Sequence, residues 1–313
     1  MESRSLRYFF HPVSGCNMCG AAPTRHRVLG RRLNGSQGMF PRGKVGITTT
    51  VMKCEVCGLV FSSPMPVPFD LHDHYGMTPE EYWKGVEFKV PDSYFVYTIK
   101  QFKSLVDFRP GMRALDIGAG LGKAMIAMER AGFDTHGFEA SKPFRDQAIG
   151  RMGVDPGRLR LGDVDTITYE AESFDLVTFG AVLEHLYDPA RSIARALGWL
   201  RPGGLIHIQV PSSDWLVARL VNCAYWIQGS DYVSNISPMH PPFHMYEFTL
   251  GSFTRNGKAQ GYEMAHHEYF ICETYMPRIL DPLLRRIMKS TDTGMEIGVW
   301  LKKVAADSAA RPT

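Results

Sequence analysis

Short apolar runs alternate with amphipathic stretches through the middle of the chain. Four such runs are each followed by helix-compatible sequence or by a loop: 113–117, 135–138, 174–179 and 205–210. This alternation is typical of strands that enter a parallel sheet through crossover helices. Just upstream, apolar residues recur at helical spacing and predict a helix over 94–106. The pattern therefore predicts an α/β fold from Arg113 onward.

The pattern changes on both sides of this region. Residues 44–53 (KVGITTTVMK) predict a strand, and the proline-rich stretch 64–82 predicts a connector. After Pro211 an irregular region extends to about Thr249, and a helix-like stretch and two late strand candidates, 264–274 and 294–302, follow. We expect three parts: a small module at 1–63, a connector with N-terminal helices at 64–112, and a main domain at 113–305 with a substrate-covering insertion at about 212–249.

Composition narrows the possible functions. The 313 residues are 44% hydrophobic, which allows one large core and a small satellite core. The net charge of +3 supplies no field that would hold a polyanion, so no nucleic acid partner is expected. The start of the chain lacks the apolar run of a signal peptide, and the apolar stretch 215–227 is too short to span a bilayer. We expect a soluble cytoplasmic protein of undefined oligomeric state.

Four of the six cysteines form two Cys-x-x-Cys pairs, each followed by glycine: Cys16 with Cys19, and Cys54 with Cys57. Four thiolates from two tight turns suit tetrahedral zinc with closed coordination. The spacing therefore predicts a zinc ribbon with a structural Zn²⁺. Cys223 and Cys272 have no such partner, so we expect ordinary core or surface thiols there.

A glycine-rich turn ends the first predicted strand of the main domain. The segment 115–122 reads LDIGAGLG and opens a helix at Lys123. Glycines let the backbone turn sharply and approach a ligand closely. The spacing G-x-G-x-G differs from the G-x-G-x-x-G of dinucleotide-binding folds, which argues against a nicotinamide or flavin cofactor.

Polar residues follow the next strands in order. Glu139 ends the second strand candidate, where a carboxylate can accept both ribose hydroxyls of a nucleoside. Asp163 and Val164 follow the third, near the expected position of an adenine edge. The segment 174–185 (FDLVTFGAVLEH) and then LRPGGL at 200–205 complete the series before the fifth strand.

In this order the motifs resemble those of class I S-adenosylmethionine-dependent methyltransferases, over roughly 113–211. The resemblance implies a Rossmann-like sheet, mostly parallel, that ends in an antiparallel hairpin, for which the two late strands are candidates. It also implies a role for each motif residue. Gly118, Gly120 and Gly122 hold the methionine end of the cofactor, and Asp116 orients that loop. Glu139 binds the ribose, Asp163 and Val164 hold the adenine, and Ala181 passes beneath the sulfonium. A similar N-terminal ribbon occurs in sugar and natural-product methyltransferases, where it helps cover the substrate.

Two histidines are candidates for the chemistry. The sulfonium methyl is already electrophilic, so the protein must align a nucleophile, exclude water and, for a hydroxyl or carbon acid, remove a proton. His185 follows the fourth strand and His244 follows the fifth, so both belong to the carboxyl edge where open α/β sheets bind ligands. Imidazole titrates near neutral pH, which suits a base. The competing interpretation of His185 is packing against the cofactor, and Tyr246 is either a substrate contact or packing.

The acceptor is less defined than the cofactor. In similar enzymes that methylate sugar carbons, a Glu-His pair occupies the loop that corresponds to Phe243-His244. The phenylalanine favours oxygen as the nucleophile, and we expect transfer to a hydroxyl of a sugar or natural-product intermediate. Methylation at a carbon or nitrogen atom of a small metabolite is an alternative. The segment 215–227 forms either a lid over the acceptor or part of the core.

Two functions of other classes are disfavoured. A nucleic-acid-modifying methyltransferase is disfavoured by the near-neutral charge and because 180–183 reads GAVL, where amino-methylating DNA enzymes carry an Asx-Pro-Pro-aromatic turn. The similar segment 240–243 (HPPF) follows a different strand. A non-catalytic scaffold that binds S-adenosylmethionine is disfavoured by the complete series of motifs.

Overall fold

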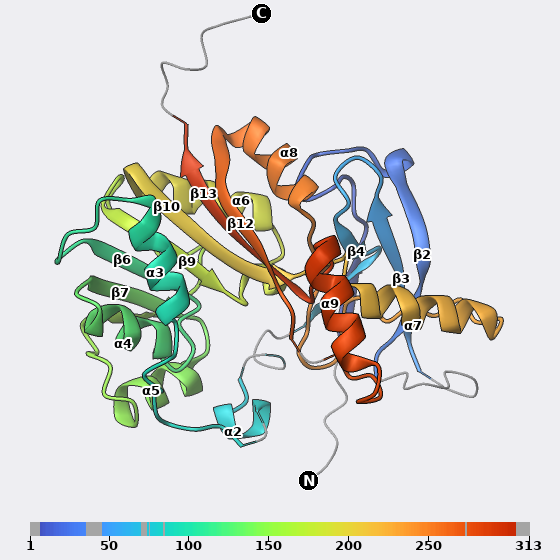
Figure 1. The fold of residues 1–313 in the computed structure, drawn as a ribbon, viewed down its shortest axis with the longest axis horizontal. Helices are drawn as coiled ribbons and strands as arrows, with labels where there is room; N and C mark the ends of the chain where they lie inside the picture. The colour runs from blue at the N-terminus through green and yellow to red at the C-terminus, as the bar shows by residue number, and fades with distance from the viewer. Residues whose placement is uncertain are drawn as a thin grey trace, which may run out of the picture.

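The computed structural model describes residues 7–35, 46–69, 74, 76–83, 85–272 and 274–304. Within these ranges the main sheet has seven strands in the order β12-β13-β10-β9-β6-β7-β8 (Figure 1). The strands are β6 (Arg113–Ile117), β7 (Asp134–Glu139), β8 (Leu159–Leu161), β9 (Phe174–Gly180), β10 (Leu200–Pro211), β12 (Tyr262–Phe270) and β13 (Glu296–Lys303). The five strands from β10 to β8 are parallel, whereas β13 is antiparallel to both β10 and β12. The predicted Rossmann-like sheet with its terminal antiparallel hairpin is confirmed.

Helices cover both faces of the parallel strands: α3 (Val96–Leu105), α4 (Lys123–Arg130), α5 (Lys142–Gly150) and α6 (Pro189–Trp199). Figure 1 shows α3 and α4 on one face and α6 on the other. Successive side chains of a strand point to opposite faces. Accordingly, Leu115 and Ile117 belong to the apolar cluster that contains Trp199 of α6, while Ala114 belongs to the cluster with Phe102 of α3.

Two smaller sheets form the N-terminal part. One has the order β11-β4-β3-β2, and in the other β1 pairs with β5. The strands are β1 (Tyr8–His11), β2 (His26–Leu33), β3 (Thr48–Cys54), β4 (Val60–Ser62), β5 (Met65–Pro68) and β11 (Tyr246–Glu247). The strand predicted over 44–53 appears as β3, although 44–45 lie outside the described residues. The expected connector contributes β5 and a one-turn helix, α2 (Pro79–Tyr82).

The N-terminal part shares the main apolar core. Cys54 and Phe61 lie in the same cluster as Phe253 of α8 (Leu250–Gln260) and the strands of the main sheet. Hydrogen bonds reinforce this contact, since the Thr249 hydroxyl donates to the carbonyl of Cys57 over 2.6 Å. The cysteine turns therefore share the main core, while the expected small satellite core lies under the N-terminal sheet, at Val51, Val60, Val233 and Ile236. The reason is that α8 packs directly against the two cysteine turns.

The region after β10 packs away from the sheet. Helix α7 (Leu216–Ile227) buries Val217, Ala218 and Tyr225, while its last turn is exposed, with Trp226 at 76%. Helix α9 (Asp281–Thr291), which was not predicted, lies between β12 and β13 along the chain. Two short 3-10 helices complete the fold: η1 (Pro23–Arg25) and η2 (Leu183–His185). Within the described ranges, none of the helices has the length and apolar character needed to cross a lipid bilayer.

Candidate active site

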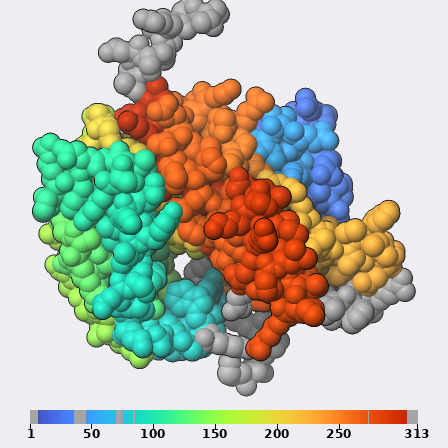
Figure 2. Space-filling view, in the orientation of Figure 1, coloured from blue at the N-terminus to red at the C-terminus, as the bar shows by residue number. Residues whose placement is uncertain are grey.

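One large cavity, about 1430 Å³, lies at the carboxyl edge of the parallel strands. Its wall includes the residues that directly follow β6, β7, β8 and β9: Gly118, Ala140, Gly162 and Ala181. Figure 2 shows the surface hollowed between the cyan part of the chain and the orange-to-red part. This is the edge at which open α/β sheets bind their ligands.

The glycine turn after β6 depends on left-handed backbone. Gly118, Gly120 and Gly122 have φ of 67°, 55° and 69°. A Cβ on Gly118 would lie 2.6 Å from Val182, and one on Gly122 would lie 2.5 Å from Val154. These two glycines are therefore required by packing. By contrast, a Cβ on Gly120 would have no neighbour closer than 3.9 Å, so Gly120 presents bare backbone to the cavity.

Gly122 differs from the other two in its position. It is the N-cap of α4 and is not among the residues that line the cavity. Its role is to begin the helix rather than to form the wall.

Glu139 ties this turn to the end of β7. Its Oε2 accepts a hydrogen bond from the N–H of Gly120 and its Oε1 accepts one from the N–H of Ser141, both over 2.7 Å. Burial nevertheless raises the pKa of Glu139. Each carboxylate oxygen has a second lone pair, so the side chain can accept further hydrogen bonds from a ligand in the cavity that it lines.

Asp116 lies at the end of β6, beneath the glycine turn. It is buried, and desolvation followed by the nearby charge of Glu139 raises its pKa to about 8. The charged form is disfavoured because burial removes the hydration of the carboxylate and a second carboxylate lies nearby. A ligand ammonium in this part of the cavity would reverse that preference.

Asp163 and Val164 form the wall after β8. The Oδ1 atom of Asp163 accepts hydrogen bonds from the N–H groups of Asp165 and Thr166, at 2.9 and 2.8 Å. One carboxylate oxygen therefore stabilises the turn, and Oδ2 is left for other partners. Val164 is buried and presents an apolar surface beside it.

The turn after β9 leads into the histidines. Ala181 lines the cavity in a left-handed conformation, with φ of 55°, and its N–H donates to the carbonyl of Gln209 on β10. This turn directs η2 back along the sheet edge. His185 at the end of η2 lines the cavity, whereas His244 is not among its lining residues and lies behind His185, with ring centroids 5.0 Å apart.

Glu184 joins the two histidines, and the sequence analysis gave it no role. Its Oε1 lies 3.7 Å from His244 Nε2 and 4.0 Å from His185 Nε2. Burial raises the pKa of Glu184 to about 8 and lowers the pKa of His185 to about 4 and that of His244 to about 3. At neutral pH both imidazoles are therefore neutral and keep a lone pair. The adjacent letters Glu-His were the only sequence signal, since His244 is distant along the chain.

Aromatic side chains form the opposite wall of the cavity. They come from the connector and the start of α3, with one from β12: Tyr82, Trp83, Tyr94, Phe95, Tyr97 and Phe270. Trp83 packs edge-on against Phe144 of α5, with ring centroids 5.1 Å apart. This wall was not predicted, because the sequence of 64–112 indicates a connector and N-terminal helices without marking the side chains that face a ligand.

The predicted cover from 212–249 is not found at the cavity. None of the described residues in that range lines it. The segment packs against the N-terminal sheet instead, because β11 pairs with β4 and Asp231 forms an ion pair with Arg31 of β2. Tyr246 is fully buried and its hydroxyl donates to the carbonyl of Tyr187, so of its two interpretations the structure supports packing.

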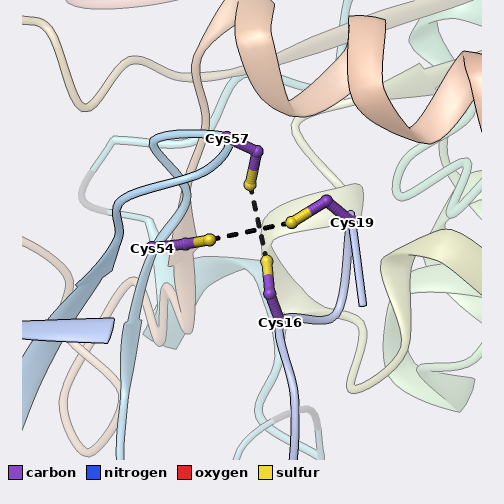
Figure 3. A group of neighbouring side chains, drawn as sticks. All are labelled: Cys16, Cys19, Cys54 and Cys57. Atoms are coloured by element: carbon purple, nitrogen blue, oxygen red, sulfur yellow. Dashed lines mark hydrogen bonds between the residues drawn. The ribbon is translucent and has the colours of Figure 1, made fainter. Parts of the chain in front are cut away.

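The four cysteines of the two pairs converge on one point (Figure 3). Cys16 Sγ lies 3.5 Å from Cys57 Sγ, and Cys19 Sγ lies 3.7 Å from Cys54 Sγ. Sulfur atoms around tetrahedral zinc are about 3.8 Å apart, given Zn–S bonds of about 2.3 Å. The four thiols thus fit a tetrahedral metal. The first turn also reaches the cavity wall, since the Asn17 amide donates to the carbonyl of Tyr187 over 2.9 Å.

Comparison with known proteins agrees with this geometry. A family model described as a methyltransferase domain matches residues 95–267, and the chain belongs to this family. An uncharacterized 37.1 kDa protein in a transposon of Streptomyces fradiae is 34% identical over 37% of this chain and 35% of its own length. A ubiquinone biosynthesis O-methyltransferase of Coxiella burnetii is 26% identical over 41% of this chain and 53% of its own length. The chain thus spans between about a third and about half of these curated relatives.

A solved S-adenosylmethionine-dependent methyltransferase from Mesorhizobium loti superimposes with a TM-score of 0.47 at 18% identity, covering 65% of this chain and 96% of that one. The expectation of a class I methyltransferase is confirmed by the family model. Membership of the family does not name the acceptor.

Proposed function

We propose that the chain binds S-adenosylmethionine in the cavity at the carboxyl edge of the sheet and transfers its methyl group to a hydroxyl of a small molecule, a sugar or natural-product intermediate. One observation carries this proposal. Candidate cofactor residues from four successive strand ends line a single cavity that also contains His185: Asp116, Gly118, Gly120, Glu139, Asp163, Val164 and Ala181.

The cofactor assignment follows from what each group offers. Gly120 presents backbone without a side chain, and Glu139 has spare lone pairs for the ribose hydroxyls. Asp116 supplies a buried carboxyl for the methionine ammonium, and Asp163 with Val164 supplies an acceptor and an apolar surface for the adenine. Gly118 and Gly122 serve by allowing the turn, and Ala181 lies on the path beneath the sulfonium.

The acceptor is proposed to lie between His185 and the aromatic wall. Flat aromatic side chains such as Trp83 and Tyr94 suit a ring-shaped acceptor, which they can contact over its face. His185 and His244 are the proposed catalytic residues, because His185 presents a neutral imidazole to the cavity and His244 lies directly behind it. Their task is to make the acceptor hydroxyl nucleophilic.

The N-terminal part, residues 1–63, is proposed to be a zinc ribbon whose structural Zn²⁺ is bound by Cys16, Cys19, Cys54 and Cys57. Residues 64–112 would form the aromatic wall, and 113–305 would bind the cofactor. Support comes from the four converging thiols and from the hydrogen bond between Asn17 and the Tyr187 carbonyl. Through that bond the ribbon would hold the loop that follows His185.

Methylation at carbon is a second candidate, and one observation favours it. Phe243 stands where the sugar carbon-methylating enzymes have a glutamate, yet Glu184 lies 3.7 Å from His244 in space. A glutamate–histidine pair is therefore available to a carbon acid. Nitrogen methylation, nucleic acid modification and a scaffold role have no comparable observation in their favour.

Calorimetric titration with S-adenosylmethionine tests the core of the proposal, and we expect one site per chain. A panel of sugar, phenolic and carbon-acid acceptors, read by mass spectrometry for the gain of one methyl group, then tests the acceptor class. Absence of S-adenosylmethionine binding would refute the enzyme function. Binding with products methylated only at carbon would replace the hydroxyl assignment.

A further inference from the structure

The cluster of Glu184, His185 and His244 has features that proton transfer alone does not explain. Its three possible ligand atoms all lie within 4.8 Å of one another. Two of the residues come from η2 after β9, and the third comes from the loop before β11. Two imidazoles and a carboxylate from separate segments thus meet beside the large cavity.

The hydrogen bond of His185 sets its tautomer. Its Nδ1 lies 3.3 Å from the carbonyl oxygen of Phe243. A carbonyl can only accept, so Nδ1 carries the proton and Nε2 carries the lone pair. Metal-binding histidines are commonly oriented in this way, by donating the other ring N–H to a backbone carbonyl. The same Phe243 precedes His244, so one short segment positions both rings.

Glu184 is a buried carboxyl group without a cationic partner among the described residues. Its side chain is 1% exposed, and its Oε2 has no hydrogen-bond partner there. The ion-pair partners found for it within the described ranges are the two imidazoles. Burial of a carboxylate without compensation costs several kcal/mol, so such groups are usually paired with a cation or bind a metal ion.

The separations suit a shared ion better than direct hydrogen bonds. The distances of 3.7 and 4.0 Å from Glu184 Oε1 to the two Nε2 atoms exceed a hydrogen bond. Ligand atoms that share a tetrahedral metal at bonds of about 2.1 Å are about 3.4 Å apart. The two distances from Glu184 Oε1 exceed that spacing by about 0.3 and 0.6 Å, and the ligand atoms of His185 and His244 lie within 4.8 Å of each other.

We propose that Glu184, His185 and His244 bind one divalent transition-metal ion at the edge of the acceptor cavity. Two imidazoles and one carboxylate suit zinc, iron, cobalt or nickel better than magnesium or calcium, which prefer oxygen ligands. Three protein ligands leave a coordination position open, in contrast to the closed set of four cysteines.

The role of this metal rests on the proposed function. The acceptor hydroxyl binds the open position, and the ion lowers the pKa of that hydroxyl. As the oxygen–methyl bond forms, the sulfur–methyl bond breaks and its electron pair stays on sulfur, while the hydroxyl proton passes to water. Both histidines then act as ligands and leave the proton to solvent.

Cobalt provides the test, with the intact chain already loaded with one zinc at the cysteines. We expect one further Co²⁺ per chain by elemental analysis after gel filtration, with visible d–d bands and without the near-ultraviolet bands of cobalt–thiolate bonds. His244→Ala and Glu184→Gln should each weaken this cobalt binding by at least ~10- to 100-fold. His267→Ala, an exposed histidine of β12, is the matched control and should bind cobalt as the parent does.

The outcomes separate the two proposals. Equal cobalt binding by the parent and both cluster variants, with all variants folded by circular dichroism, would overturn the metal site. So would full methyl transfer in a chain that retains cysteine-bound zinc but binds no second metal, and the proposed function would then stand. If S-adenosylmethionine does not bind but the second cobalt does, the proposed function fails and the metal site stands.

Discussion

The two halves of the cavity are built in different ways. The cofactor half consists of residues that directly follow parallel strands, such as Gly118 after β6 and the acid Glu139 at the end of β7. The acceptor half combines segments far apart in the chain, including Trp83, His185 and Phe270. A site made at strand ends is encoded locally, whereas a site assembled from distant segments depends on the whole fold. Substitutions in the two halves should therefore affect different measurements.

The largest expected effect is in the acceptor half. We predict that His244→Ala reduces turnover by ~10² to 10⁴, because the acceptor hydroxyl loses the group that makes it nucleophilic. The affinity for S-adenosylmethionine should stay unchanged, since His244 is not part of the cavity wall. Steady-state kinetics and calorimetry measure the two quantities. Unchanged turnover would remove His244 from the mechanism, and His267→Ala serves as the control.

The next effect belongs to the cofactor half. Glu139→Ala removes the acceptor for the N–H groups of Gly120 and Ser141 as well as the proposed ribose contact. Hydrogen bonds to a charged group contribute about 1.5–3 kcal/mol, so we expect the Kd for S-adenosylmethionine to rise by ~10- to 100-fold. Glu129→Ala, on the exposed side of α4, is the control and should bind normally. Normal affinity in Glu139→Ala would refute the ribose assignment.

A smaller effect tests whether the acceptor contacts the aromatic wall or the segment 212–249, which the sequence predicted to cover the substrate. Trp83→Ala should raise the acceptor KM by ~3- to 10-fold, because an aromatic contact contributes about 0.5–1.5 kcal/mol beyond burial. Trp226→Ala, at the exposed end of α7, should leave KM unchanged because α7 does not line the cavity. The reverse result would assign the acceptor to the region 212–249.

The last prediction is a pH dependence of stability. Burial raises the pKa of Asp116 to about 8, so the folded state holds a proton that the unfolded state releases near pH 4. Stability of the ligand-free chain should therefore fall as the pH rises from about 4 to 8. Across this range, the melting temperature should fall less steeply for Asp116→Asn than for the parent. S-adenosylmethionine should also reduce the fall in the melting temperature of the parent. Identical slopes for both chains would exclude Asp116 as the cause.

The sequence predicted the parts of the fold that local pattern controls. The strands β6, β9 and β10 have apolar runs, and the turn at Gly118–Gly122 has residues that tolerate left-handed backbone. Their residue types suffice because each feature is completed within a few residues. The same holds for the two Cys-x-x-Cys turns.

Other features depend on contacts that no local pattern reveals. Helix α9 is an exception, because Leu283, Leu284, Ile287 and Met288 recur at helical spacing and local pattern could have predicted it. The late strand expected over 264–274 ends at Phe270. Strand β2 was not predicted, because three of its eight residues are arginines and its burial does not alternate regularly along the strand. Glu184 and His244 come together through tertiary structure. The sequence therefore suggested the histidines but could not place the glutamate between them.

The short strand β11 has a consequence for biosynthesis. It completes the N-terminal sheet by pairing Tyr246 with Phe61 of β4, two residues separated by most of the chain. During translation at about 5–20 residues per second, β11 is synthesised roughly 10 to 40 s after β4. The edge of β4 is unpaired for that time. An open strand edge is a template for pairing with other chains. The Zn²⁺ ion that we propose for the cysteine turns would, if bound early, hold this nascent segment in a native-like shape and shield it from aggregation.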